Sequence, residues 1–321
     1  MYRYKSILAR KEKKIGETLR REIAGLDPVV QPLAVHVVEA GGKRIRPLMA
    51  VLMAAAFGCR DEAVYETGCA IELLHGASLM HDDVVDGAAV RRGSPAAHAV
   101  FGESRAILAG DVLLASCMRI VLRTRIFEII DSVATAAEKT AAGEVDEICN
   151  LRNPDLDYAS YLRIITGKTA WLLRSACEVG ALHAGISPEQ VAAAARYGLE
   201  LGIAFQLVDD ALDIAPEKKT GKPTGGDLRE GKVTPLIHFY MESMNAEERA
   251  AFAKGFASAS FSDREVQAHV KAMRALKCDE RTRALADAHL RNAEEALGLV
   301  PAGQERDILR SMIDYIRNRD H

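Results

Sequence analysis

The sequence contains HDDVVD at residues 81–86 and QLVDDALD at residues 206–213. Each stretch carries Asp-Asp-x-x-Asp within an apolar run that lacks glycine and proline, a pattern typical of a helix. Residues four apart lie on one face of a helix, so Asp82 pairs with Asp86 and Asp209 pairs with Asp213. Two such helices can face each other across a cavity, where their carboxylates would attract a hard divalent cation.

Segments with helical periodicity dominate the rest of the chain. Short breaks with turn-forming residues, such as Gly41-Gly42 and Asn153-Pro154, separate them. We find no convincing alternation of apolar and polar residues, so a substantial sheet is not expected. No linker or low-complexity stretch divides the chain, and we expect one all-α domain over residues 1–321. The expected helical segments are 48–56, 62–79, 104–122, 126–148, 158–181, 188–214 and 263–297.

The composition excludes several classes of protein. With 42 basic and 45 acidic residues and a net charge of -3, the chain lacks the excess of basic residues that favours nucleic-acid binding. Its six cysteines show no CxxC spacing, which indicates reduced thiols in a cytoplasmic protein. No apolar segment follows the basic start, so we expect no signal peptide. The longest apolar stretches, such as 48–59, are shorter than the roughly 20 residues of a membrane span.

The aspartate clusters point to a metal site. Three acids within one helical turn raise one another's pKa, and burial does the same. Mg²⁺ would relieve both penalties, because it binds one or two carboxylates and completes its octahedral shell with water and substrate phosphate. For one such stretch, a solvated acidic helix face is an equally good interpretation. Two copies in apolar sequence favour a function.

Basic residues occur in the positions that a metal–phosphate site needs. Arginine binds phosphate oxygens through its planar fork, and lysine supplies a point charge. Each basic segment alone is best interpreted as an ordinary surface turn, and the loop at 222–232 lacks the order of a P-loop. These segments are GGKRIRP at 41–47, Arg91-Arg92, Lys168-Thr169 and KPTGGDLREGK at 222–232.

Taken in order, these motifs resemble those of the trans-type polyprenyl diphosphate synthases. The resemblance extends from about Gly41 to Leu236 and is highly specific. The motifs that carry it are GGKRIRP, LLHGASLMHDDVVDGAAVRRGSPAAH, FGESRAILAGDVLLA, YLRIITGKTA, FQLVDDALDI and GKPTGGDLREGKVTPL. It implies the isoprenoid synthase type I fold, a helical bundle around a deep central cavity. It also implies transfer of the prenyl group of an allylic diphosphate to isopentenyl diphosphate, repeated head to tail, with release of pyrophosphate.

The resemblance also assigns roles to residues. Asp82, Asp86 and Asp209 would bind three Mg²⁺ ions, with Mn²⁺ as an alternative, and Asp83, Asp210 and Asp213 would support them. The allylic diphosphate would contact Arg91, Lys168, Lys222 and Lys232. Isopentenyl diphosphate would contact Lys43, Arg46, His75 and Arg92. Thr169, Gln206 and the carbonyl of Lys168 would stabilise the allylic cation. Phe205 would either line this pocket or pack in the core, and we consider the two equally plausible.

Glu72-x-x-His75 has the spacing found in di-iron carboxylate bundles, but the chain has no second such motif. We therefore expect His75 to contact phosphate, and a buried histidine of the core is the alternative. Two positions depart from the family pattern. Glu147 stands where a glutamine is frequent, and Thr234-Pro235-Leu236 replaces Thr-Leu-Pro, which puts the helix start after Lys232 in doubt.

The residues one turn before Asp82 predict the product. Ala77 and Ser78 are small, whereas aromatic residues near these positions close the pocket in short-chain family members. We expect a long product, with octaprenyl diphosphate as the first choice and farnesyl or geranylgeranyl diphosphate as the alternative. A class I terpene cyclase and a non-enzymatic cation-binding helical protein are less favoured alternatives. We further expect a homodimer that contacts a membrane only transiently, to release product.

Overall fold

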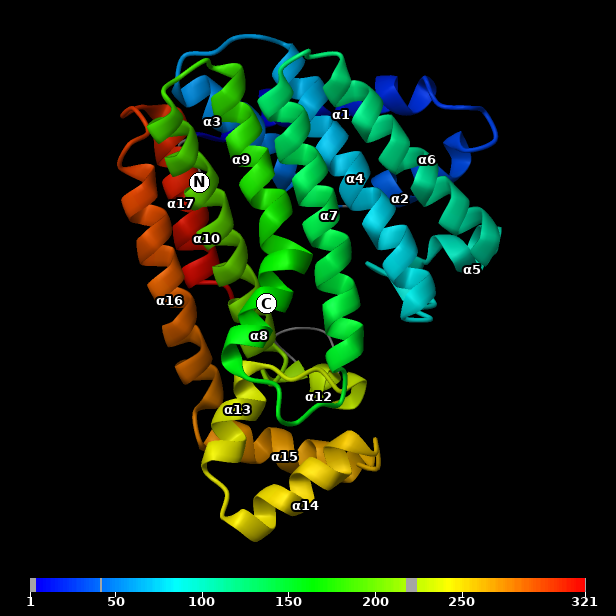
Figure 1. The fold of residues 1–321 in the computed structure, drawn as a ribbon, viewed down its shortest axis with the longest axis vertical. Helices are drawn as coiled ribbons and strands as arrows, with labels where there is room; N and C mark the ends of the chain where they lie inside the picture. The colour runs from blue at the N-terminus through cyan, green and yellow to red at the C-terminus, as the bar shows by residue number, and fades with distance from the viewer. Residues whose placement is uncertain (1–3, 41, 218–223, 321) are drawn as a thin grey trace. The chain divides into compact units, whose positions relative to one another are not determined.

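The structure is a computed structural model that describes residues 4–40, 42–217 and 224–320. In these ranges the chain is almost entirely helical (Figure 1). The strands found there are β1 (Val90–Arg91) and β2 (Ser94–Pro95), which form one antiparallel hairpin. The prediction of an all-α fold without a substantial sheet is therefore confirmed.

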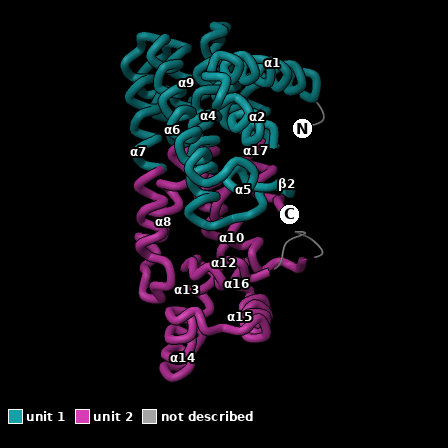
Figure 2. The backbone as a smooth tube through the Cα atoms, turned by 90° about the vertical axis from the view of Figure 1, so that its right-hand side faces the viewer, with its two compact units in different colours: residues 1–140, 172–198, 296–311 teal, residues 141–171, 199–295, 312–321 magenta. Residues whose placement is uncertain are grey.

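The chain forms two compact units, each assembled from separate stretches of sequence (Figure 2). The first unit comprises residues 1–140, 172–198 and 296–311, and the second comprises residues 141–171, 199–295 and 312–321. Both α7 (Phe127–Asn150) and α10 (Pro188–Leu212) contribute residues to each unit. The single domain expected over residues 1–321 stays a prediction.

The first unit is built around helix α4 (Ala63–Val85), which packs along α6 and α3. Its buried side chains include Ile71, Leu73 and Met80 on α4 and Leu113 on α6, all fully covered. Burying such side chains stabilises the fold by about 1.5–3 kcal/mol each. The unit's other helices are α1 (Lys5–Ala24), α2 (Gln31–Glu39), α3 (Ile45–Ala56), α5 (Ala97–Phe101), α6 (Glu103–Leu122), α9 (Trp171–His183) and most of α17 (Gln304–Arg317).

The second unit holds shorter helices at the ends of α7 and α10. Asn245 and Ser262 each accept a hydrogen bond from the backbone N–H three residues on, and Glu248 and Glu265 return one. These capping boxes fix where α14 and α15 begin. The unit's helices are α8 (Tyr158–Ile165), the π-helical turn η2 (Thr166–Ala170), α12 (Gly226–Glu230), α13 (Pro235–Glu242), α14 (Ala246–Ala257), α15 (Asp263–Ala275) and α16 (Cys278–Leu297).

The expected helix over residues 263–297 is wrong, because two helices occupy it. Lys277 adopts a left-handed conformation with φ of 57° between α15 and α16, and this ends the first helix. Helix α10 ends at Leu212, two residues before the expected end at residue 214. By length and composition it could cross a membrane, yet 61% of its most apolar window is buried within the protein, as in a core helix. All six cysteines are free, as expected.

Candidate active site

The first aspartate cluster lies where α4 ends, in the first unit. Asp82 is in the last turn of α4, and Asp86 is the residue that follows the helix. Helix C-termini carry partial negative charge, so carboxylates there are unfavourable unless a cation compensates them. Asp83 is buried and pairs with Nε of Arg91 from β1. Asp82 and Asp86 are more accessible, so these two carboxylates are the ones that a cation could reach.

A cluster of charged residues lies nearby in the same unit, on α3, on α4 and after β1. Burial lowers the pKa of Arg46, and the carboxylate of Glu72 opposes this. Burial also lowers the pKa of His75 well below its usual value, and the cations Arg46 and Arg92 add to the effect. Both effects favour the neutral form of the His75 imidazole. The structure thus brings together three of the four residues predicted for isopentenyl diphosphate.

Two features of this cluster favour an anionic ligand. Within the described chain, the Nε donor of Arg46 is buried without a hydrogen-bond partner, and such atoms are rare in folded proteins. A Cβ at Gly42 would lie 2.7 Å from Nη1 of Arg92, so the glycine lets this guanidinium lie against the backbone. The fourth predicted residue, Lys43, is exposed. The sequence suggested Glu72 only as a possible iron ligand and did not predict that its carboxylate interacts with Arg46.

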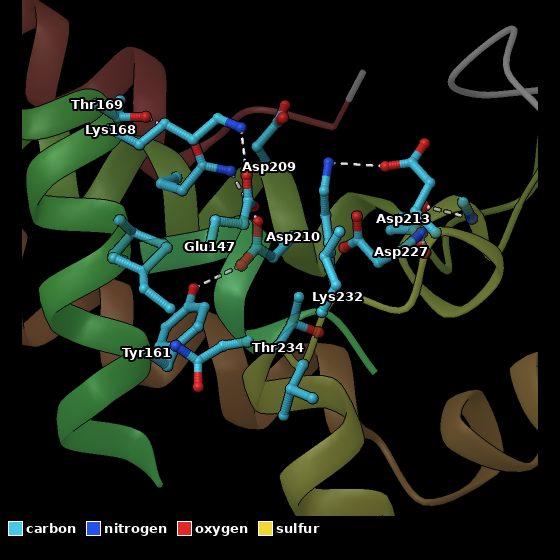
Figure 3. Close-up of a pocket in the computed structure, with 18 of the residues that line it drawn as sticks. Glu147, Tyr161, Lys168, Thr169, Asp209, Asp210, Asp213, Asp227, Lys232 and Thr234 are labelled. Carbon is cyan, nitrogen blue, oxygen red and sulfur yellow. Dashed lines mark hydrogen bonds and ion pairs between the residues drawn. The ribbon is translucent and has the colours of Figure 1, made fainter. Parts of the chain in front are cut away.

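The second aspartate cluster lines a pocket of about 900 Å³ in the second unit (Figure 3). Its walls come from α7, α8, η2, the end of α10, α12 and the C-terminal tail. The lining includes five charged side chains predicted from the sequence, together with Thr169 and Gln206. The five are Asp209, Asp210, Asp213, Lys168 and Lys232. Lys222 lies outside the described residues.

The three aspartates of this cluster have different surroundings. Asp210 is buried and accepts hydrogen bonds from the Tyr161 hydroxyl and from Nε2 of Gln206, the latter at 2.8 Å. Burial raises the pKa of Asp210 to about 7, although both hydrogen bonds act in the opposite direction. Asp213 accepts the backbone N–H of Gly226 at 2.9 Å. These contacts leave Asp209, whose side chain is 47% exposed, as the most accessible carboxylate.

Lys168 lies on the π-helical turn η2, and two carboxylates of α7 hold it. Its Nζ is 2.9 Å from Glu144 Oε2 and also contacts Glu147. Burial lowers the pKa of Lys168, but the two carboxylates outweigh burial and raise it above its usual value. Glu147, the departure from the family pattern, therefore contacts Lys168 directly. Isolated π-turns are frequent at functional sites.

Thr169 follows Lys168 on the same turn and donates a hydrogen bond of 3.0 Å to Oε1 of Gln206. Since Gln206 in turn donates to Asp210, these side chains form a chain of hydrogen bonds along one wall of the pocket. The sequence left open whether Phe205 lines the pocket or packs in the core. The guanidinium of Arg319 lies over the Phe205 ring, with a distance of 4.8 Å between Cζ of Arg319 and the ring centre.

Lys232 and Asp227 form the opposite side of the pocket (Figure 3). Nζ of Lys232 is 2.7 Å from Glu230, and nearby carboxylates raise its pKa although burial lowers it. Burial and the neighbouring Asp213 raise the pKa of Asp227 well above its usual value. The doubt about the following helix is resolved: Thr234 is extended, and α13 begins normally with Pro235 at its first position.

The carboxylates fit a divalent metal of the magnesium type. In the described ranges no group of three His, Cys, Asp or Glu side chains converges as a ready-made cage. Mg²⁺ does not need one, because one or two carboxylates, water and substrate phosphates complete its shell. Asp82, Asp86 and Asp209 supply hard oxygen ligands of this kind at accessible positions.

Comparison with known proteins agrees with these features. Residues 27–273 match the family described as polyprenyl synthetase. The chain belongs to the polyprenyl synthetase family. It is 32% identical over 321 residues to the short chain isoprenyl diphosphate synthase of Methanothermobacter thermautotrophicus, covering 98% of each chain. It is 38% identical over 239 residues to the octaprenyl diphosphate synthase of Haemophilus influenzae, covering 74% of this chain and 72% of that one.

Solved structures of family members share the fold. A decaprenyl diphosphate synthase from Rhodobacter capsulatus superposes with a TM-score of 0.93 at 31% identity, covering 99% of each chain. A polyprenyl synthase from Caulobacter crescentus, complexed with calcium and isoprenyl diphosphate, gives 0.89 at 34% identity, covering 98% of this chain and 97% of that one. The predicted isoprenoid synthase type I fold is confirmed, and the chain is a prenyltransferase of this family, which acts on isoprenyl diphosphates.

Several residues that line or support the pocket were not predicted from the sequence. Tyr161 precedes Lys168 by seven positions, a helical spacing that could have placed both on one face. Glu144 precedes Glu147 by three positions and could have been found in the same way. No such signal exists for Arg319, because it lies more than a hundred residues from Asp209 in the sequence.

Proposed function

We propose that the protein elongates an allylic diphosphate with isopentenyl diphosphate in a Mg²⁺-dependent reaction and makes a long, octaprenyl-like polyprenyl diphosphate. The observation that carries the proposal is the second-unit pocket, where an accessible carboxylate at Asp209 lies with the half-buried cations Lys168 and Lys232. Acidic groups for a metal beside basic groups for phosphate are what a metal–diphosphate substrate requires. Calcium and isoprenyl diphosphate in the Caulobacter crescentus relative support the same choice of ligands.

The aspartates would bind and position the metal ions. Asp82, Asp86 and Asp209 would hold three Mg²⁺ ions, which when bound would supply charge to stabilise the departing pyrophosphate. Asp83 and Asp210 keep their neighbours in place through Arg91 and Tyr161.

The diphosphates would be bound by two sets of basic residues. Arg46, His75 and Arg92, with Lys43, would hold isopentenyl diphosphate. The neutral His75 ring can donate one hydrogen bond without adding charge. Arg91, Lys168, Lys222 and Lys232 would orient the allylic diphosphate.

The allylic carbocation needs a polar surface that does not react with it. The hydroxyl oxygen of Thr169 and the amide of Gln206 are fixed to each other, which leaves neither free to rotate toward the cation as a nucleophile. Dipoles held in place in this way stabilise developing charge without reorganising.

Product length would depend on the wall of α4. Ala77 is buried and Ser78 is partly exposed, and Ser78 Oγ donates to the carbonyl of His75 at 3.0 Å. Ala77→Tyr and Ser78→Phe should both shorten the product, as mass spectrometry would measure. Because Ala77 is fully packed, the second variant guards against a folding defect at the first. A full-length product from a folded Ser78→Phe protein would contradict this assignment.

We also infer a homodimer, with transient membrane contact for release of the apolar product. The support is a pair of exposed apolar side chains on α6, Ile107 and Leu108, which are 41% and 62% exposed. Apolar surface of this kind can be covered by a second copy of the chain. Sedimentation equilibrium would test the dimer, and a monomer at micromolar concentration would contradict it.

Elongation is tested with farnesyl diphosphate, labelled isopentenyl diphosphate and Mg²⁺. Asp82→Asn and Asp209→Asn should each lower kcat by at least about a hundredfold, since each removes charge from a metal ligand. Asp131→Asn, an exposed aspartate on α7, is the matched control and should keep the parental rate. Cyclic hydrocarbon without use of isopentenyl diphosphate would indicate a terpene cyclase. Parental rates in both variants, or in EDTA, would refute the proposal.

A further inference from the structure

The C-terminal tail places a cation directly on the accessible aspartate of the second cluster. Arg319 lies two residues beyond α17, and its Nη2 is 2.9 Å from Asp209 Oδ1. Its side chain is only 17% exposed, and it contributes to the lining of the pocket. Both partners belong to the second unit.

Several contacts hold this arginine in position. Nη2 of Arg283, on α16, donates to the carbonyl of Arg319 at 2.9 Å, and the N–H of Arg319 donates to the carbonyl of Ile316 at 3.2 Å. The guanidinium also stacks over the Phe205 ring. An arginine on an aromatic face is attracted to the ring's electrons. The ion pair with Asp209 is therefore anchored from the backbone and from the ring.

We propose that Arg319 is a counter-cation that occupies Asp209 in the metal-free protein and so sets the affinity of the second cluster for divalent metal. The inference rests on the proposed function, in which Asp209 is a metal ligand. Both oxygens of Asp210 already accept hydrogen bonds, and Asp213 accepts from the backbone of α12. A metal that binds Asp209 therefore shares or displaces the Oδ1 atom held by the guanidinium, and this competition would weaken its binding.

The neighbouring Arg317 forms ion pairs that do not involve the pocket. It pairs with Asp287 at 3.3 Å and Asp314 at 3.4 Å, and its side chain is twice as exposed, at 36%. Neither partner lines the pocket, whereas Asp209 does. Arg317→Gln thus removes the same charge from the same tail without touching the cluster, and it is the matched control.

The test measures Mn²⁺ binding without substrate by the loss of the free-ion electron paramagnetic resonance signal. Arg319→Gln should tighten the Asp209-dependent Mn²⁺ site by about three- to tenfold, as expected for loss of a partly buried competing ion pair. Arg317→Gln should bind Mn²⁺ like the parent. The double variant Asp209→Asn/Arg319→Gln should lose the gain, and circular dichroism confirms that each variant is folded.

Two results would overturn the inference. One is parental Mn²⁺ affinity in folded Arg319→Gln; the other is equal tightening in Arg317→Gln, which would indicate a general charge effect. Prenyl elongation, assayed separately, distinguishes this failure from that of the proposed function. If Asp209→Asn abolishes elongation while Arg319→Gln leaves Mn²⁺ affinity unchanged, only the role of Arg319 is refuted. If Asp209→Asn elongates at the parental rate, the metal assignment itself is refuted.

Discussion

Gly143 lies on α7 against the π-turn that carries Lys168, and its replacement by alanine tests whether that turn must stay where it is. A Cβ at this position would lie 2.5 Å from the backbone N of Lys168 and 2.8 Å from Cα of Gly167. Ordinary contact begins at 3.4 Å, so the methyl group meets backbone that cannot rotate away. Either α7 or the π-turn has to move.

The expected loss of stability follows from two opposing effects. Overpacking of this kind costs typically about 1–3 kcal/mol. Alanine gains up to about 1 kcal/mol over glycine within a helix. Because the methyl group meets backbone, we expect a cost near the upper end of that range, so the free energy of unfolding should fall by about 2 kcal/mol. The effect on catalysis should be larger, because a displacement of about 1 Å at a positioning group can cost about a hundredfold in rate. We expect kcat to fall at least about tenfold.

The chain carries its own reporter for this change. Trp171, its one tryptophan, directly follows the π-turn. Gly143→Ala should shift the emission of Trp171, lower the midpoint of urea unfolding and slow prenyl elongation. Gly16→Ala is the control. Gly16 is also within a helix, but its new methyl group would meet only the tips of two flexible side chains, Arg44 at 3.0 Å and Arg20 at 4.0 Å. Parental emission, stability and rate in Gly143→Ala would refute the reasoning.

Three further predictions concern the same pocket. Glu147→Gln removes one of the carboxylates that hold Lys168, so the KM for the allylic diphosphate should fall severalfold in initial-rate measurements; an unchanged or higher KM would argue against competition by Glu147. Tyr161→Phe takes a donor from the buried Asp210, which should destabilise the protein by about 1–3 kcal/mol and lower kcat more than it changes KM; equal urea midpoints for variant and parent would contradict this. Burial raises the pKa of Asp210 to about 7 and the pKa of Asp227 well above its usual value. An unfolded aspartate loses its proton at about pH 4, so between about pH 4 and about pH 7 the folded state binds more protons than the unfolded state. The contribution of these groups to the free energy of unfolding should therefore fall as pH rises through this window; in EDTA, Asp227→Asn should flatten the dependence, and an unchanged slope would count against it.

Helical periodicity and turn-forming residues predicted much of the fold from the sequence. The expected helix over 188–214 does begin at Pro188, where Gln190 donates its backbone N–H to Ser187 Oγ at 3.3 Å. The break between α15 and α16 at Lys277 could not be predicted, because a lysine in the left-handed conformation leaves the helical periodicity on both sides intact. The π-turn at 166–170 was missed for a similar reason: one extra residue in a turn changes which side chains align without changing composition.

The sequence by itself determined most of the helices, the family and the acidic and basic residues of the site, because spacing along a helix and motif order are local properties. Tertiary structure alone decided how these residues are used. It pairs Asp83 of α4 with Arg91 of β1, places Tyr161 of α8 against Asp210 of α10, and brings Arg319 onto Asp209. The physical reason is that burial and ion pairing depend on neighbours in space, and in these cases the neighbours come from different segments of the chain.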